Sequence, residues 1–365
     1  MASGKTSKTN FVLVVEMHSS SVKVSVVNMT HGNPIQIQSE VICSSEMNFS
    51  LSQKSNSYLV SLKKMIELTT REFELYRQIN SNNETKKNIS KISSVQYVLS
   101  SPWILSQAHT VSVKFRKNEK ITENFVNNIL DKKDIKPSFH IKGDMQTIER
   151  KVLDVSLNGY PITDWKGKLA SSVDITCIVS AVNTNLITDL QELCLNIVGT
   201  KSISFHSSLV LQYIASSSLS DPSFSVLIIN IHGEITDVFG FSKQNGIFFG
   251  SFPIGYNTLV SRFSSATHQG KLASESVLSM HSSLNLDITH NHGSVKIIDK
   301  MLSQWKYECL EFVKVAFPQL HKPHIFISSR KFVSLFSRNA RSIRSGAKCE
   351  ELPHYVINEA LSSLL

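Results

Sequence analysis

Cysteine is scarce in this chain, and long apolar runs are missing. The five cysteines among 365 residues are dispersed and lack a Cys-X-X-Cys spacing, which excludes a disulfide framework and implies no metal cluster. No run approaches the ~20 apolar residues that a membrane helix needs. The first ten residues, MASGKTSKTN, lack the apolar core of a signal peptide. We therefore expect a cytoplasmic protein that reaches the inner face of the cell membrane only indirectly, as a peripheral protein.

Motifs of familiar enzymes and nucleic-acid binders are also missing. The sequence contains no Gly-X-Ser-X-Gly, no His-Glu-X-X-His and no Gly-X-X-X-X-Gly-Lys-Ser/Thr. The formal charge of +9 comes from scattered basic residues, and no nucleic-acid motif accompanies it. The charge therefore favours an ordinary solvated surface, and we expect no nucleic-acid partner. A hydrophobic content of 41% indicates a globular protein with ample core.

A strand-rich stretch, 224–258, organises the second half of the chain. Its apolar run at 224–229 is typical of a strand buried on both faces. A polar turn at 230–234 follows, and the pattern then predicts a β-hairpin over 236–253. Gly255 ends this unit. The order is thus strand, polar turn, hairpin and glycine turn.

The N-terminal segment contains a second polar turn between strands. Residues 11–27 predict two strands joined by a turn that has one carboxylate and three serines. Backbone N–H groups and small hydroxyls in such a turn can bind a phosphate, while the carboxylate can hold water around Mg²⁺. The candidate binding residues here are Glu16, His18, Ser19, Ser20, Ser21 and Lys23.

Together the two turns resemble the phosphate-binding loops of the actin-like ATPase superfamily, in its FtsA-like (cell division) and PilM-like (type IV pilus assembly) branches. The first loop of that family reads Asp-Ile-Gly-Ser-Ser-Ser-Ile-Lys, and Glu16 stands at its Asp. The second reads Asp-Ile-Gly-Gly-Gly-Thr-Thr-Asp, and Asn230 stands at its first Asp. The candidate residues of the second loop and the turns after it are Asn230, His232, Gly233, Thr236, Asp237, Gly255, Ser328 and Ser329.

The resemblance implies ATP with Mg²⁺ as the cofactor and Glu16 as the metal-binding residue. Two departures argue against tight binding. Asn230 lacks the family carboxylate, so we assign no catalytic residue with certainty. The adenosine-facing Thr-Gly-Gly-Gly turn of the family reads Ser328-Ser329-Arg330-Lys331 here, and backbone that carries side chains should not admit adenosine as glycines do. We predict weak or lost ATP binding; the alternative is an active ATPase with an altered site.

The histidines at the two loops allow two interpretations. The loops face each other across a cleft in the family, so His18 and His232 could bind an anion when protonated or a metal when neutral. Alternatively, the two rings fill space that a nucleotide would otherwise take. We favour the second interpretation, since paired histidines in a sequence are often not a site.

The resemblance also implies a fold and a domain organisation. We expect an α/β protein with the bilobal actin-like (ribonuclease H-like) fold and a small FtsA-type α/β subdomain inserted in the first lobe. A helix starting near Thr122 and an Asn158-Gly159 turn belong to that insertion. The expected division is a disordered tail (1–10), the first lobe (11–104 and 183–222), the inserted subdomain (105–182) and the second lobe (223–365).

The implied function is that of a scaffold. Such a protein would link membrane-associated cell-division or type IV pilus machinery through protein contacts, and would self-associate or form filaments in some members of the family. The pattern over 157–182 favours the FtsA branch. The modest length, and a segment 355–365 that is too short and poorly charged for a membrane-binding helix, favour the PilM branch. The choice between division and pilus stays open.

Overall fold

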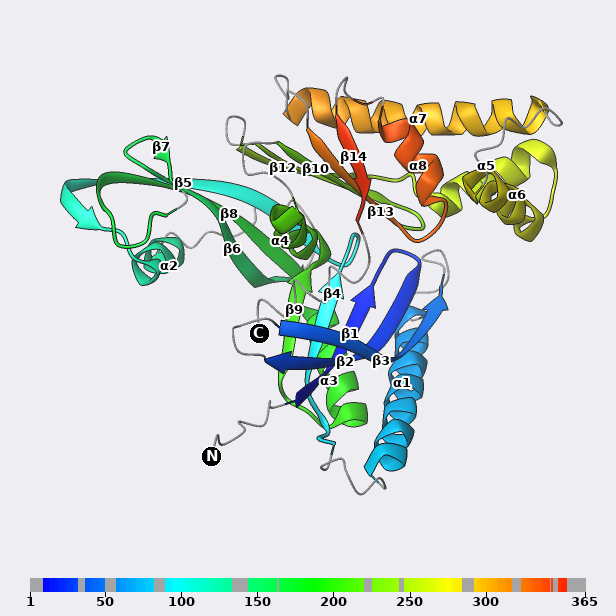
Figure 1. Cartoon of the computed structure of the whole chain (residues 1–365), viewed down its shortest axis with the longest axis horizontal. Helices are drawn as coiled ribbons and strands as arrows, with labels where there is room; N and C mark the ends of the chain where they lie inside the picture. The colour runs from blue at the N-terminus through cyan, green and yellow to red at the C-terminus, as the bar shows by residue number, and fades with distance from the viewer. Residues whose placement is uncertain are drawn as a thin grey trace, which may run out of the picture.

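The structure is a computed structural model, and it describes residues 9–31, 37–49, 57–81, 89–132, 144–162, 164–219, 225–242, 246–283, 292–316, 323–341, 343 and 347–352. These residues form three β-sheets with helices around and between them (Figure 1). The combination is the α/β class that the sequence predicts. The C-terminal segment 355–365 lies outside the described residues.

The first sheet, called the N-terminal sheet below, has the strand order β3-β2-β1-β4-β9. Its strands are β1 (Thr9–Met17), β2 (Ser21–His31), β3 (Ile37–Asn48), β4 (Ile92–Leu99) and β9 (Ile203–Ser207). Helices α1 (Ser57–Ser81) and α3 (Thr184–Val198) pack on one face, where alternate residues of β1 such as Leu13 and Val15 meet their apolar sides. Helix α3 ends at Gly199, whose φ of 75° is the left-handed cap conformation that glycine favours.

The second sheet, called the C-terminal sheet, has the order β12-β11-β10-β13-β14. Its strands are β10 (Val226–Ile231), β11 (Thr236–Ser242), β12 (Gly246–Phe252), β13 (His324–Ser329) and β14 (Lys348–Glu351). Helices α5 (Tyr256–Thr267), α6 (Lys271–Ser283), α7 (His292–Ala316) and α8 (Val333–Ala340) accompany it. Helix α7 lies along the outer face of the sheet (Figure 1), where its Trp305 is fully buried.

The third sheet, called the insertion sheet, falls in sequence between β4 and β9. It contains β5 (Leu105–Lys120), β6 (Met145–Leu157), β7 (Tyr160–Pro161) and β8 (Leu169–Asn183) in the order β5-β8-β6-β7, and α2 (Glu123–Lys132) packs on it. Asn158 and Gly159 join β6 to β7 with φ angles of 53° and 81°. Two consecutive positive φ values define the tight hairpin turn that an Asn-Gly pair predicts.

Helix α4 (Ser208–Leu219) lies between the N-terminal and C-terminal sheets (Figure 1). Its Val210 packs in one cluster with Val12 and Val14 of β1 and with Ile228 of β10. Both central strands are therefore covered on both faces, by this shared core and by the outer helices. This double burial explains the continuous apolar runs in their sequences.

Three details of the sequence prediction are wrong. Thr9 and Asn10 belong to β1 rather than to a disordered tail, because they pair with β2; the rest of 1–10 lies outside the described residues. The sequence predicts a strand over 110–115, but β5 extends well beyond it, since its polar ends still pair with β8. Strand β14 was not predicted; it reads Lys-Cys-Glu-Glu and has no apolar run.

Candidate functional site

Strand alternation directs four predicted site residues into the space between the N-terminal and C-terminal sheets. In β1, alternate residues face α4, and Glu16 continues that row. Asn230 of β10 is in register with Asp237 of β11 and with Ser328 of β13. All four side chains are buried. The sequence therefore brings one carboxylate from the first sheet toward a polar group of strand ends in the second.

The turn after β1 packs directly against the turn after β10. A Cβ atom on Gly233 would lie 1.8 Å from Ser20 Oγ, so only glycine permits this approach. Ser19 Oγ accepts a hydrogen bond from the Glu234 backbone N–H at 3.1 Å, and Ser20 Oγ lies 3.3 Å from the Tyr256 hydroxyl. A hydrogen bond thus joins the two turns directly, and the close approach of Gly233 to Ser20 leaves little space between them.

The start of helix α5 also packs against the turn after β10. Gly255 precedes the helix, and a Cβ atom there would lie 2.3 Å from the His232 carbonyl oxygen. The backbone N–H of Tyr256 donates to that oxygen at 3.0 Å, and the N–H of Asn257 donates to the Gly233 oxygen at 2.8 Å. Free N–H groups at a helix start attract anions. Here those two groups bind carbonyls of the neighbouring turn instead.

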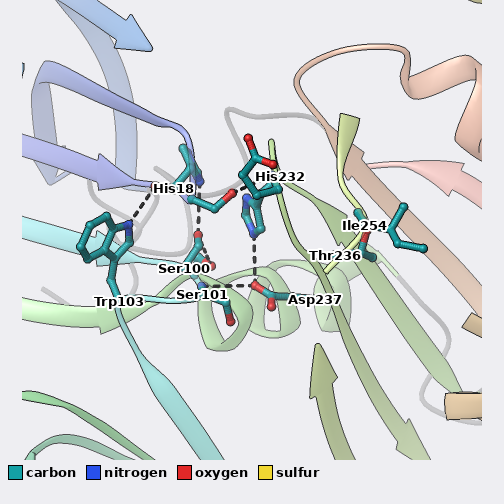
Figure 2. A network of polar contacts seen from close by, with 11 residues as sticks. His18, Ser100, Ser101, Trp103, His232, Thr236, Asp237 and Ile254 are labelled. Carbon is teal, nitrogen blue, oxygen red and sulfur yellow. Dashed lines mark hydrogen bonds and ion pairs between the residues drawn. The ribbon is translucent and has the colours of Figure 1, made fainter. Parts of the chain in front are cut away.

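His18 and His232 stack on each other between the two sheets (Figure 2). Their ring centroids are 5.2 Å apart with an interplanar angle of 27°. His18 Nδ1 lies 3.2 Å from Ser100 Oγ, and the Trp103 indole N–H donates to the His18 carbonyl oxygen at 2.8 Å. Burial lowers the pKa of His18 to about 4 against the opposing effect of Glu16, and His232 lowers it further. At neutral pH this favours the uncharged form of His18, which weakens the attraction of the ring for an anion.

Asp237 ties the second turn to the end of β4. Its Oδ2 atom lies 3.1 Å from His232 Nε2 and accepts a hydrogen bond from the Ser101 backbone N–H at 3.4 Å (Figure 2). His232 is thus held between the His18 ring and a buried carboxylate. This arrangement orients both rings and makes them part of the contact between the sheets.

The Arg330 side chain extends from the turn after β13 to the turn after β1. Its guanidinium donates to Ser21 Oγ at 2.6 Å and forms an ion pair with Glu46 of β3. Burial lowers the pKa of Arg330, and the nearby Glu16 carboxylate counteracts this. The side chain therefore lies on the first turn, at the position where the resemblance places glycines that admit adenosine.

The three cations nearest the two turns each have a carboxylate partner. Lys23 Nζ lies 3.3 Å from Glu16, Arg330 pairs with Glu46, and Lys331 Nζ lies 2.5 Å from Glu275. Binding a polyphosphate here would require breaking these pairs or adding Mg²⁺ to offset the acidic groups. The charged groups around the two turns therefore do not favour the binding of a nucleotide without Mg²⁺.

Two other predicted residues have structural partners. The Thr236 hydroxyl donates to the Ile254 carbonyl oxygen at 2.6 Å and accepts from the Trp305 indole N–H at 3.1 Å, so it faces the outer helices and not the cleft (Figure 2). The Ser329 hydroxyl donates to the Lys331 carbonyl oxygen at 2.7 Å, which closes its own turn. Neither side chain is directed at a ligand.

ATP with Mg²⁺ does not fit this arrangement of the predicted residues. The turn after β1 is covered by the turn after β10 and by Arg330, and the N–H groups at the start of α5 are hydrogen-bonded. Glu16, the predicted metal-binding residue, has Lys23 as a partner, and Asn230, at the family Asp position, carries no charge. The structure thus brings most of the predicted residues together between the two sheets, whereas the hydroxyls of Thr236 and Ser329 bind backbone carbonyls of their own surroundings.

Sequence reasoning missed several residues that complete this site. Ser100, Ser101 and Trp103 follow β4, which is parallel to β1, and the ends of parallel neighbours meet at one sheet edge. The Ser-Ser-Pro-Trp sequence after an apolar strand is the signal that could have placed them there. No comparable signal marks Tyr256 or Glu46, because each is a single residue within an ordinary helix or strand.

No family model matches the sequence, and no curated protein matches it. Comparison with solved structures shows that the chain has the bilobal actin-like ATPase fold, as predicted. It is similar to PilM: a chain of the PilM–PilN type IV pilus biogenesis complex aligns with a TM-score of 0.59 and 13% identity, over 95% of this chain and 89% of that one.

Two further structures align with lower scores. MreB 5 of Spiroplasma citri bound to AMPPNP gives a TM-score of 0.48 and 10% identity, over 98% of this chain and 96% of its own. The ethanolamine utilization protein EutJ from Carboxydothermus hydrogenoformans gives 0.48 and 9%, over 96% and 89%. In the part of this chain that the structure describes, no helix is long and apolar enough to span a membrane.

Proposed function

We propose that this protein is an actin-like scaffold that acts through protein contacts and has weak or no ATP binding. The observation that carries the proposal is the direct packing of the turn 18–21 against the turn 232–234. Gly233 meets Ser20 too closely for even one added carbon, and Arg330 lies against Ser21. In ATP-binding members of the superfamily, bound nucleotide stabilises the closed arrangement of the two turns. In this protein side chains stabilise it.

The proposed role is a link between membrane-associated machinery and the cytoplasm. The similarity to PilM, whose structure was solved with PilN in a type IV pilus biogenesis complex, supports a pilus assembly partner over a cell-division partner. A protein of this kind would lie at the inner face of the membrane through its partner. Self-association into a filament is a further option that the fold allows.

A groove along β6 supports a role in binding protein segments. It has a volume of about 570 Å³ and lies between β6, α3 and β9, with Ile148, Lys151 and Phe205 among its lining residues. Among the described residues, only Ser156 and Leu157 of β6 have a strand partner on the edge away from β8. An extended segment of a partner could therefore add to this edge by backbone hydrogen bonds.

Calorimetric titration with ATP and Mg²⁺ tests the nucleotide part of the proposal. We expect no binding in the micromolar range for the wild-type protein. Micromolar binding that Ser19→Ala weakens about tenfold or more, while Thr188→Val on the exposed side of α3 leaves it unchanged, would establish the alternative, an ATP-binding actin-family ATPase with an altered site.

Site-specific photo-crosslinking in cells tests the partner part. A crosslinker at Lys151 should attach a membrane-anchored component of pilus assembly, whereas one at Lys271 on α6 should not. A division protein in the same adduct would replace the pilus assignment. Equal labelling from both positions would show that the β6 groove is not the contact.

A further inference from the structure

A small cavity lined by Asp237 lies beside the paired turns. It has a volume of about 90 Å³, enough for roughly three water molecules. Its walls come from the segment after β4, from the start of β5, from the junction of β9 and α4, and from β11 and β12. The cavity therefore lies where the N-terminal sheet, the stem of the insertion sheet and the C-terminal sheet meet.

Hydroxyl and carboxylate groups line part of this cavity, beside apolar residues such as Leu209 and Phe249. Six serines and one aspartate line it, and its wall contains no lysine, arginine or histidine. The serines are Ser100, Ser101, Ser106, Ser207, Ser208 and Ser251. The single formal charge on the wall is thus the Asp237 carboxylate.

Two of these oxygens are buried without a hydrogen-bond partner. Asp237 Oδ1 and Ser207 Oγ each expose less than 1 Å² and make no hydrogen bond to the residues that the structure describes, and both residues are 1% exposed. Figure 2 shows that His232 and Ser101 both contact the other carboxylate oxygen of Asp237. A buried carboxylate oxygen without a partner is costly. A ligand that oxygen atoms can coordinate would therefore stabilise these two atoms.

The donor set defines the class of that ligand. Carboxylate and hydroxyl oxygens without nitrogen or sulfur select hard cations. One carboxylate balances one positive charge, and the volume excludes a metabolite. From this geometry we propose that the cavity binds a monovalent cation, Na⁺ or K⁺, between Asp237 and Ser207, and that the ion joins the C-terminal sheet to the junction of β9 and α4.

Thermal unfolding in matched salts tests this site without ATP. The full chain is unfolded in KCl, NaCl and choline chloride at the same ionic strength of about 0.15 M, with a chelator that removes divalent ions. The melting temperature in one of the small cations should exceed that in choline chloride by about 2 °C or more and rise with its concentration. Choline is much larger than either ion and serves as the reference cation.

Two variants and one control separate ion binding from a general salt effect. Asp237→Asn and Ser207→Ala should each abolish the difference between salts, and Ser207→Ala serves if Asp237→Asn fails to fold. Glu234→Gln, which removes a neighbouring carboxylate outside the cavity wall, should keep it. Identical melting temperatures of the wild-type protein in all three salts would overturn the proposal and leave water as the content of the cavity. A difference that survives Ser207→Ala would also overturn it.

Discussion

The bodies of the central strands and the ends of the same strands have opposite character. Residues Val12 to Val15 and Val226 to Ile229 are apolar and buried on both faces. One or two residues further on, the chain is equally buried but polar, with Glu16 and Asn230. The apolar bodies specify the actin-like framework, whereas the polar ends decide what the space between the sheets contains. In this protein that space contains the chain's own hydrogen bonds and ion pairs.

Gly255→Ala should disturb the strand ends most. Its Cβ atom would meet two backbone carbonyl groups, at 2.3 and 2.4 Å, which cannot move aside as a side chain would. We expect a loss of unfolding free energy of about 3 kcal/mol or more, measured by urea denaturation. Gly270→Ala is the control, because a Cβ there meets nothing within 4 Å; equal effects of the two substitutions would contradict the close packing.

The His18 ring should make stability depend on pH. Its pKa is lowered from 6.5 to about 4 by burial, so the unfolded state binds more protons between these values. Stability therefore falls as the pH falls from 6.5 to 4, by at most about 3 kcal/mol for this residue. The difference between wild-type and His18→Gln stability should shrink over that window.

Two other buried groups shape the same pH profile. His206, whose pKa burial also lowers to about 4, acts in the same direction. Glu149 acts in the opposite direction, because burial raises its pKa to about 7 and its contribution is lost as the pH rises from 4.5 to 7. The comparison with His18→Gln cancels both. A constant difference across the window would show that His18 is not buried as a neutral ring.

Thr236→Val should cost about 2 kcal/mol, since it leaves the Ile254 carbonyl and the Trp305 indole N–H without their partner in a buried position. Chemical denaturation with Thr188→Val, on the exposed side of α3, as a control measures this. A change of ATP affinity instead of stability would place Thr236 in the cleft and contradict its assignment to the outer core.

The Arg330–Glu46 pair should show a smaller coupling. A double-mutant cycle with alanine is expected to give about 1 kcal/mol, because both side chains are only partly buried. The Lys166–Glu123 pair, with 60% and 64% of the two side chains exposed, should give almost none. Equal coupling in both cycles would mean that Arg330 does not hold the turns together.

Much of the framework follows from the sequence for identifiable reasons. Double burial produces apolar runs long enough to mark β1 and β10, and the Asn158-Gly159 pair has the φ values that its turn type requires. The resemblance to the phosphate loops places both histidines at facing turns, and the rings do stack. The proposed division into two lobes and an inserted subdomain remains a prediction, although each part has its own sheet.

The contents of the site are less predictable, because they depend on contacts between residues far apart in the chain. Nothing local indicates that Arg330 reaches Ser21, or that Thr236 faces Trp305 rather than the cleft. The direction of Thr236 follows only from the register of β11. A motif position therefore predicts where a residue lies in the chain more reliably than which way its side chain points.

Hydrogen exchange at the two turns tests the central claim most directly. The backbone amides of His18, His232 and Glu234 are hydrogen-bonded in the two turns and should exchange slowly without nucleotide. ATP with Mg²⁺ should leave their rates unchanged, because the chain itself closes the space between the sheets. Fast exchange that ATP slows would show instead that the turns form an open nucleotide site, and would contradict the account.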